Sequence, residues 1–372
     1  MRVILPKNLL AERLSFLERV IPSRSSNPLF TYLGLALGQD ALVLFGSNGE
    51  VDLEAGLPAE VQGEGRYLVP AQPFFQLVRS LPGEQVELVL GGDLELVSGA
   101  FRTRLALAPT EGYPELSFPE PHPSETYPWQ TTLPVEDLLR ALTHVRYAAS
   151  HEEYRAIFRG VQLEFSEGGM RSVASDGYRL ALYQLERPQP FQKKAVVPAR
   201  SVDEVARVLK GVGAGEVVLA LGPGTLGLAV REGEGWVRLA VRLMEGEFPD
   251  YERVIPKEFP LKATLEAEAF REALRRVSVL ADRQNHRVDL FFQEGRVLLS
   301  AEGDYGKGQE ELPVALEGTP LAVAYNARYL LEALGPISGQ AALWLSGPTS
   351  PSLIRPAEEG LGYQAVVVPL RV

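Results

Sequence analysis

An internal threefold repeat constrains the fold of this chain more than any other feature. Amphipathic segments at 4–23, 132–150 and 264–282 each begin with a strand-like stretch and continue with apolar residues at helical spacing. A second trio of strand-then-helix segments starts at residues 67, 195 and 321, which are 128 and 126 residues apart. The 372 residues therefore divide into three copies of one unit of about 120–130 residues.

The segments between the predicted helices have the pattern of antiparallel strands. Stretches at 41–56, 170–185 and 296–312 place turn-forming residues at corresponding points of each unit, as Asn-Gly and Asp-Gly do in the first two. Pro-rich polar stretches at 118–128 and 255–260 resemble linkers. We expect an α+β protein with two helices packed on antiparallel sheets in each domain. The predicted domains are 1–119, 129–256 and 260–372.

Motifs of enzymatic chemistry are scarce. The chain has no cysteine, which excludes disulfides and thiolate chemistry and suits a reducing cytoplasm. Its four histidines show no metal-ligand spacing, and the glycine-rich run at 222–227 precedes a strand-like rather than a helical pattern. No apolar run is long enough to span a membrane. We expect no catalytic residue, cofactor or metal; an enzyme with a carboxylate metal site is the alternative hypothesis.

The net charge of −11 argues against a protein that grips DNA tightly, yet the charge is distributed unevenly. The six predicted helices contain fifteen basic and ten acidic residues, a surplus of five, whereas the remainder carries −16. These helices are 6–24, 70–82, 134–150, 198–210, 268–283 and 326–335. Although a single basic helix face is usually just solvated, a pooled surplus predicts a surface that attracts phosphates weakly and without sequence preference.

Three long motifs resemble those of the bacterial beta clamps, the beta subunits of DNA polymerase III. The segment 173–181, VASDGYRLA, resembles their V-A-T-D-G-H-R-L-A, and 247–256, EFPDYERVIP, resembles their F-P-D-Y-x-x-V-x-P. The terminal VVVPLRV is similar to their V-M-P-M-R-L. The resemblance covers the whole chain, including its repeat.

The resemblance implies three tandem copies of the DNA-clamp fold and a head-to-tail homodimer, a six-domain ring around double-stranded DNA. Such a ring is a non-catalytic processivity factor that tethers the replicative polymerase. The implied protein partners bind through a short clamp-binding peptide: the replicative polymerase alpha subunit, the clamp loader, repair polymerases, and ligase or mismatch-repair proteins. Loading onto DNA would use ATP that another protein hydrolyses.

The resemblance also places a peptide pocket between the second and third domains. Its apolar and small positions would be Phe158, Ser175, Gly177, Tyr178, Leu180, Pro249, Val254, Val366, Val368 and Leu370. Its polar and rim positions would be Arg179, Arg253, Asn326, Tyr329, Ser352, Pro369 and Arg371. Taken singly, Leu180, Val254 and Val368 are more typical of a hydrophobic core. The chain has Tyr178 where His is common, Phe158 where Leu is common, and Val368 and Leu370 where Met occurs.

Two further surfaces follow from the resemblance and from helix position. The ring interface would join Leu105 and Leu107 of the first domain to Val279 and Leu280 of the third, although all four suit an ordinary core. Contacts to DNA would come from the loop of Arg24 and, as a second candidate, the loop of His151 and Tyr154. Helix position alone adds Lys7, Arg146 and Arg200.

Overall fold

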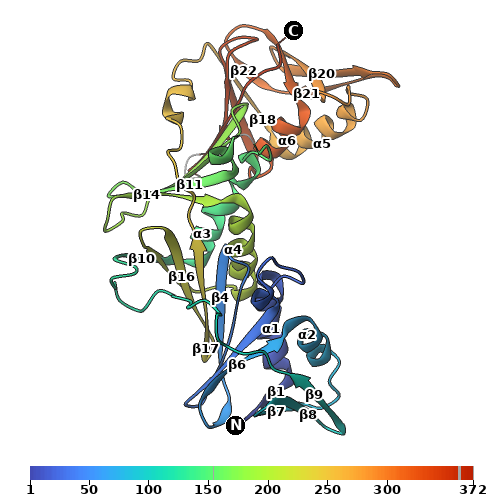
Figure 1. Cartoon of the computed structure of the whole chain (residues 1–372). Helices are drawn as coiled ribbons and strands as arrows, with labels where there is room; N and C mark the ends of the chain where they lie inside the picture. The colour runs from blue at the N-terminus through green and yellow to red at the C-terminus, as the bar shows by residue number, and fades with distance from the viewer. Residues whose placement is uncertain (154, 359–361, 372) are drawn as a thin grey trace. The chain divides into compact units, whose positions relative to one another are not determined.

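The computed structural model describes residues 1–153, 155–358 and 362–371. It divides into two compact units, one formed by Met1–Leu139 with Arg200–Met244 and the other by Arg140–Ala199 with Glu245–Val372 (Figure 1). The second repeat therefore contributes to both units, and the division falls within α3 (Val135–Thr143) and at the start of α4 (Ala199–Val212). The predicted domain boundaries remain a proposal.

The first unit contains two antiparallel sheets. The larger has the order β10-β15-β16-β17-β4-β3-β2-β6, with β10 (Trp129–Pro134), β15 (Glu216–Leu221), β16 (Thr225–Glu232), β17 (Gly235–Arg242), β4 (Val51–Pro58), β3 (Ala41–Ser47), β2 (Tyr32–Gly38) and β6 (Gly65–Pro70). The smaller has the order β5-β1-β7-β8-β9, with β5 (Glu60–Gln62), β1 (Arg2–Pro6), β7 (Gln85–Leu90), β8 (Asp93–Ser98) and β9 (Phe101–Ala106). Helices α1 (Lys7–Val20) and α2 (Ala71–Arg79) pack against each other, and η1 (Pro28–Thr31) is a short 3-10 turn.

The second unit has the same organisation. Its larger sheet has the order β14-β11-β12-β13-β26-β25-β24-β18-β22, with β14 (Lys193–Pro198), β11 (Gly160–Ser166), β12 (Gly169–Ser175), β13 (Arg179–Leu185), β26 (Tyr363–Val367), β25 (Ser352–Pro356), β24 (Gln340–Leu345), β18 (Leu261–Glu266) and β22 (Ala315–Glu317). Its smaller sheet has the order β21-β20-β19-β23, with β21 (Gly306–Pro313), β20 (Arg296–Gly303), β19 (Arg287–Gln293) and β23 (Leu321–Asn326). Helices α5 (Ala267–Ser278) and α6 (Ala327–Leu334) pack together, and the 3-10 turns are η2 (Arg146–Ala148), η3 (Ala156–Arg159) and η4 (Tyr251–Val254).

The repeat predicted from the sequence is confirmed by the element order. The first helix of each repeat follows a strand in β1–α1, β10–α3 and β18–α5, and the second does so in β6–α2, β14–α4 and β23–α6. Each helix turns one apolar face to the core, as α1 does with Leu10, Leu14 and Leu17, which are at most 3% exposed. The fold is α+β with two helices per repeat, as expected.

Neighbouring repeats share their sheets, through strand pairings that no local sequence pattern predicts. Strand β17 of the second repeat pairs with β4 of the first, and β13 of the second pairs with β26 of the third. In the second pairing, Leu180 lies opposite Val366 and Arg179 opposite Val367. Because directly opposite residues face the same side of a sheet, this register places the terminal motif, which begins at Val366, beside the motif at 173–181.

Five of the six predicted helices end earlier than expected, and in three of them the shortening corrects the charge estimate. Helix α1 stops at Val20 because Ile21 has extended backbone angles and Pro22 follows it. Arg24, Arg146 and Arg283 consequently lie outside the α-helices, as does Asp282. The six α-helices of the described residues thus carry twelve basic and nine acidic residues, a surplus of three. No helix in the described part of the chain is long and apolar enough to cross a membrane.

Candidate functional site

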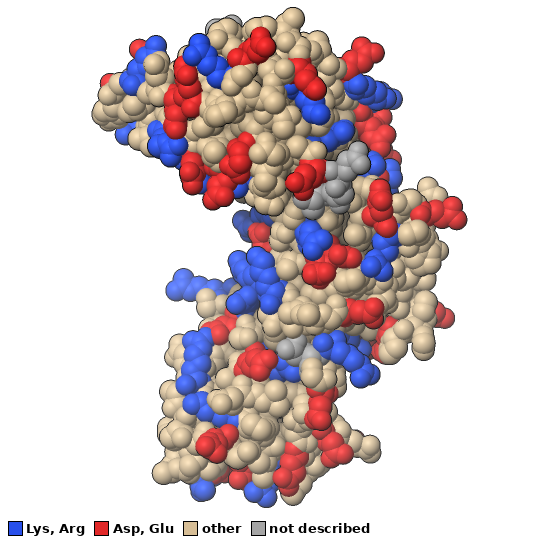
Figure 2. All heavy atoms as spheres, turned by 180° about the vertical axis from the view of Figure 1, so that it is seen from behind, with Lys and Arg blue, Asp and Glu red and all other residues tan. Residues whose placement is uncertain are grey.

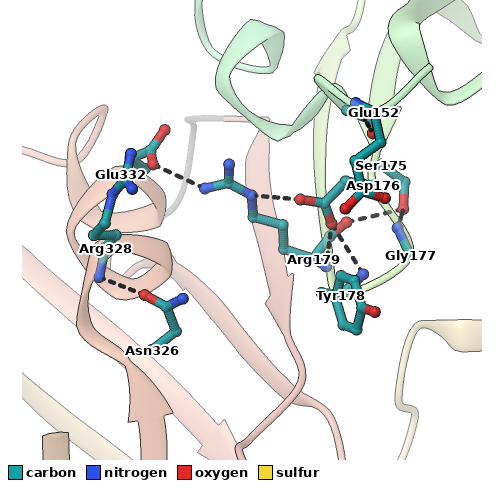
Figure 3. Close-up of polar contacts among 10 residues, drawn as sticks. Glu152, Ser175, Asp176, Gly177, Tyr178, Arg179, Asn326, Arg328 and Glu332 are labelled. Carbon is teal, nitrogen blue, oxygen red and sulfur yellow. Dashed lines mark hydrogen bonds and ion pairs between the residues drawn. The ribbon is translucent and has the colours of Figure 1, made fainter. Parts of the chain in front are cut away.

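The turn between β12 and β13 is built by its own side chains. The carboxylate of Asp176 accepts hydrogen bonds from the backbone N–H groups of Tyr178 at 2.9 Å and Arg179 at 3.0 Å. Gly177 adopts φ +89°, a left-handed conformation that favours glycine. The Ser175 hydroxyl donates to the carbonyl of Arg179 at 2.8 Å. These contacts fix the direction in which Tyr178 and Arg179 leave the turn (Figure 3).

Arg179 is buried, with 7% of its side chain exposed, and lies between two carboxylates. Its Nε donates to Asp176 Oδ2 at 3.1 Å, and its Nη1 lies 3.1 Å from Glu332 Oε1 on α6 (Figure 3). The guanidinium also lies 4.4 Å from the ring centre of Tyr329. Arg179 therefore joins the turn of the second repeat to helix α6 of the third, because a buried cation needs such partners.

Tyrosines surround the other side of this guanidinium. The ring centre of Tyr147 lies 5.5 Å from it, and the hydroxyls of Tyr147 and Tyr363 are 2.5 Å apart. Tyr363 in turn donates to the carbonyl of Ala333 at 2.6 Å. Burial raises the pKa of both hydroxyls above the ordinary tyrosine value, so both stay neutral donors at physiological pH. The junction beneath the turn is thus a closed polar network.

The opposite face of the shared sheet is apolar. A row of directly opposed residues crosses it from β13 to β24: Leu180, Val366, Leu353 and Trp344. Leu180 and Val366 are only 2% and 3% exposed and form a core cluster with Leu353 and Tyr251. The chain between β17 and β18 covers part of this cluster with Phe248, Ile255 and Phe259. Leu180 and Val366 therefore support the surface from beneath.

Three large apolar side chains remain exposed beside this cluster, and we call Tyr178, Val254 and Val368 the apolar patch. Their exposed fractions are 54%, 53% and 37%. The backbone N–H of Val368 donates to the carbonyl of Tyr178 at 3.0 Å. Val254 ends η4, whose first residue, Tyr251, belongs to the core cluster. Leu180, Tyr251 and Val366, which lie two or three positions from these residues in the sequence, belong to that one cluster, so the three exposed side chains lie around it.

A polar network holds η4 on the sheet, and the sequence reasoning missed it. The Tyr251 hydroxyl contacts Glu164 at 2.5 Å and accepts from Arg171 Nη1 at 3.2 Å. Arg171 also pairs with Glu252 at 2.8 Å. The signal available in the sequence was Tyr251 itself, inside the motif at 247–256, but its partners lie on β11 and β12. The network fixes the position of Val254.

The remaining residues of the predicted pocket take different places. Phe158 is half-buried, 6.3 Å from the ring of Phe248, whereas Pro249 and Arg371 are exposed. Arg253 is also exposed and pairs with Asp250 at 2.8 Å.

The other predicted pocket residues make structural contacts. Asn326 caps α6 by accepting from the N–H of Arg328 at 3.0 Å (Figure 3). Pro369 is buried, and the N–H of Leu370 donates to the carbonyl of Ala324 at 2.8 Å. Ser352 is 1% exposed, and its hydroxyl contacts that of Tyr325.

The residues predicted to face DNA differ in their surroundings. Arg24, His151 and Arg200 are exposed. The Lys7 ammonium donates to the carbonyl of Leu81 at 2.5 Å, and Arg146 Nε donates to that of Ala199 at 3.0 Å. Tyr154 lies outside the described residues. Basic and acidic side chains are intermingled on the face shown in Figure 2, so the negative net charge of the chain is compatible with local positive charge.

The residues predicted to form the ring interface lie near strands at sheet edges. Leu105 lies on β9, the last strand of its sheet, and Leu107 follows it; both are half-buried. Val279 is 77% exposed just after α5, and Leu280 beside it is half-buried. In the same unit, β21 is the last strand of the smaller sheet. Edge strands present unpaired backbone groups that a second chain can pair with.

The described residues contain no group of three or more His, Cys, Asp or Glu side chains placed to hold a metal ion. The polar contacts at the β12–β13 turn are instead internal, since Asp176 and Glu332 both face Arg179. What the geometry offers is a hydrophobic surface with charged residues near it, an arrangement suited to binding an extended peptide.

Comparison with known proteins matches the whole chain. Family models of the DNA polymerase III beta subunit match as its N-terminal domain at 1–117, its central domain at 132–250 and its C-terminal domain at 252–371. The beta sliding clamp of Caulobacter vibrioides is 30% identical over 386 residues, covering 100% of both chains. The crystal structure of the DNA polymerase III subunit beta from Pseudomonas aeruginosa is 26% identical, with a TM-score of 0.92 and full coverage of both chains. A sliding clamp of the same organism bound to griselimycin has a TM-score of 0.91, with the same identity and coverage.

Proposed function

The chain belongs to the DNA polymerase III beta subunit family, and we propose that it encircles duplex DNA as a homodimeric ring. It acts as a sliding clamp, a non-catalytic processivity subunit that keeps the replicative polymerase on its template. The observation that carries this function is the match of three beta-clamp domains in order over the whole chain. The comparisons give no support to the alternative of an enzyme with a carboxylate metal site.

The ring would close through the edge strands of two chains. Strand β9 of one copy would lie beside β21 of the next, and the second copy would repeat the contact in the other direction. Such a head-to-tail pair is closed by a two-fold axis, so it forms a ring and not a filament. The two edge strands also differ in charge, with Arg102 and Arg104 on β9 and Glu310 and Glu311 on β21, although each of these side chains already has a partner in its own chain.

The apolar patch would receive the hydrophobic anchor of a clamp-binding peptide. Tyr178, Val254 and Val368 offer the contact surface, and the exposed Arg253 and Arg371 offer charges beside it. The peptides would come from the replicative polymerase alpha subunit, the clamp loader, repair polymerases, and ligase or mismatch-repair proteins. We further propose that the protein works in the cytoplasm, because it lacks cysteine and its partners act on chromosomal DNA.

Contacts with DNA would be few and weak, as sliding requires. A ring holds DNA by topology, so tight phosphate pairing would slow its movement. The exposed Arg24 and Arg200 are the best placed of the predicted residues, because Lys7 and Arg146 already donate to backbone carbonyls. Such contacts carry no sequence information and depend strongly on salt.

Replacing Arg200 by Gln should weaken binding to open linear duplex and lower its salt dependence. Each lost phosphate contact reduces the slope of log affinity against log salt by about 0.9. The slope is measured by fluorescence anisotropy of a labelled duplex across a salt series. The matched control is Arg2→Gln, because Arg2 pairs with Glu87 at 2.7 Å on the five-stranded sheet. An unchanged slope for Arg200→Gln would remove this residue from the DNA-facing surface.

A further inference from the structure

The row of residues beneath the apolar patch continues into two cations. Beyond Val366 and Leu353 it reaches Trp344 on β24 and then Lys262 on β18, each directly opposite its neighbour. Arg355, two residues after Leu353 on β25, shares the same face. From β26 to β24 is two strand spacings, about 10 Å, which about three residues of extended chain would cover. The three side chains therefore lie within reach of a peptide bound at the patch.

Both cations lie over the indole of Trp344. The Lys262 ammonium is 5.2 Å from the ring centre, and the Arg355 guanidinium carbon is 5.4 Å from it. Trp344 is half-buried and packs on Phe259 and on the core cluster, so its own position is fixed. A ring held in this way fixes two long, flexible side chains from the strands on either side of β24, which lowers the entropy cost of using both at once.

These two cations have no carboxylate partner within ion-pair distance among the described residues. Glu317 lies opposite Lys262 in the β18–β22 register, yet it forms no ion pair with that ammonium. The polar partner of Arg355 is the neutral amide of Gln364, at 3.1 Å. Partial burial lowers the pKa of the Arg355 guanidinium, and no carboxylate of the described residues offsets that effect. A positive charge left uncompensated beside an apolar binding surface favours an acidic ligand.

We propose that Lys262, Trp344 and Arg355 form a docking surface for acidic residues that flank the clamp-binding peptide of a partner protein. This inference rests on the proposed function of the apolar patch, which holds the hydrophobic anchor. The acidic residues then pass over the chain between η4 and β18, which covers part of the cluster, and place their carboxylates on Lys262 and Arg355. The surface discriminates between partner proteins by the charge of the residues that flank the hydrophobic anchor, and this discrimination does not depend on the sequence of the anchor.

Single-stranded nucleic acid is the competing ligand, because cations and aromatic rings together also bind bases. That mode needs an open aromatic face on which a base stacks. Here Lys262 and Arg355 lie against the ring of Trp344, and Phe259 packs beside it at 6.4 Å between ring centres. The surface therefore presents two positive charges and not an open aromatic face, which favours carboxylates over bases as ligands.

The test uses the full-length protein and synthetic peptides at low salt. One peptide carries the clamp-binding sequence alone, two carry three added Asp residues at one end or the other, and two carry Asn in place of Asp. We expect the Asp extension at one end to tighten binding about three- to tenfold over its Asn counterpart, as two exposed ion pairs allow. The gain should disappear in the double variant Lys262→Gln, Arg355→Gln. The control Lys194→Gln should keep it, since Lys194 lies on the same sheet about 29 Å away, six strand spacings from β24.

The outcomes separate this inference from the function on which it rests. The docking surface is supported if the parent, the double variant and Lys194→Gln bind the unextended peptide equally, and only the double variant loses the gain in affinity from Asp over Asn. No gain from Asp at either end, or a gain that survives in the double variant, overturns it while leaving the patch in place. Failure of the unextended peptide to bind would instead reject the proposed function of the patch. Loss of oligo-dT binding in the double variant, without any Asp effect, would identify a nucleic-acid site and overturn the proposal.

Discussion

A protein in which Val254 and Val368 are both replaced by Asp should fold normally and yet lose affinity for clamp-binding peptides by at least about 100-fold. Val254 is 53% exposed and Val368 is 37% exposed, and neither belongs to the core cluster, so neither substitution removes core packing. Burying a Leu-sized anchor contributes about 1.5–3 kcal/mol, and each tenfold in affinity corresponds to about 1.4 kcal/mol. Carboxylates on the patch remove that contribution and add the cost of their own desolvation. Isothermal titration of the double variant with a peptide of the replicative polymerase measures the loss.

The control for this experiment is an equally drastic change at an exposed aromatic residue elsewhere. Tyr305 is 77% exposed in the turn between β20 and β21, so Tyr305→Asp should leave peptide affinity within about twofold of the parent. Sizing and circular dichroism confirm that each variant is folded. Unchanged peptide affinity in a folded Val254→Asp, Val368→Asp protein would show that peptides bind elsewhere.

The second large effect should come from Val279, which is 77% exposed in the single chain. We expect Val279→Asp to raise the dissociation constant of the dimer by more than about 100-fold. A two-fold ring contains the interface twice, so one substitution places two carboxylates in apolar contacts, each with a desolvation penalty of several kcal/mol. Sedimentation velocity at low micromolar concentration should show the 40.8 kDa chain alone for the variant and a dimer for the parent.

The conservative variant Val279→Ile serves as the matched control, because it keeps the apolar contact and should remain dimeric. The monomer of Val279→Asp should still bind clamp-binding peptide with parental affinity, since the patch and this residue occupy different elements. A stable dimer of Val279→Asp would place the interface elsewhere and leave Leu105, Leu107 and Leu280 as packing residues of single chains.

The repeat and its helices were predictable because they depend on local signals. Apolar periodicity located all six helices. Helix ends were less well predicted, since the charged residues after Val20 and Ser278 continue the polar pattern although the helices stop there. The pooled positive charge was therefore overestimated.

The strand pairings that join the repeats and the burial of Arg179 were beyond the reach of a single sequence. Pairing of β13 with β26 joins residues almost two hundred positions apart, and no local pattern specifies such a register. Arg179 reads as a rim residue in its motif, yet Glu332 and Tyr329 of another repeat enclose it. The Tyr251 network was missed for the same reason, because its partners Glu164 and Arg171 come from separate strands.

Retention on closed DNA tests most directly the claim that the protein encircles its template. The clamp is loaded onto nicked circular DNA by its loader and ATP, salt is raised, and half of the sample is cut once with a restriction enzyme. Bound protein is then separated from free protein by gel filtration. If the ring holds DNA by topology, it stays on the circles at salt concentrations that release it from linear molecules, because linkage does not depend on charge pairs. Release from circular and linear DNA at the same salt concentration would contradict the account.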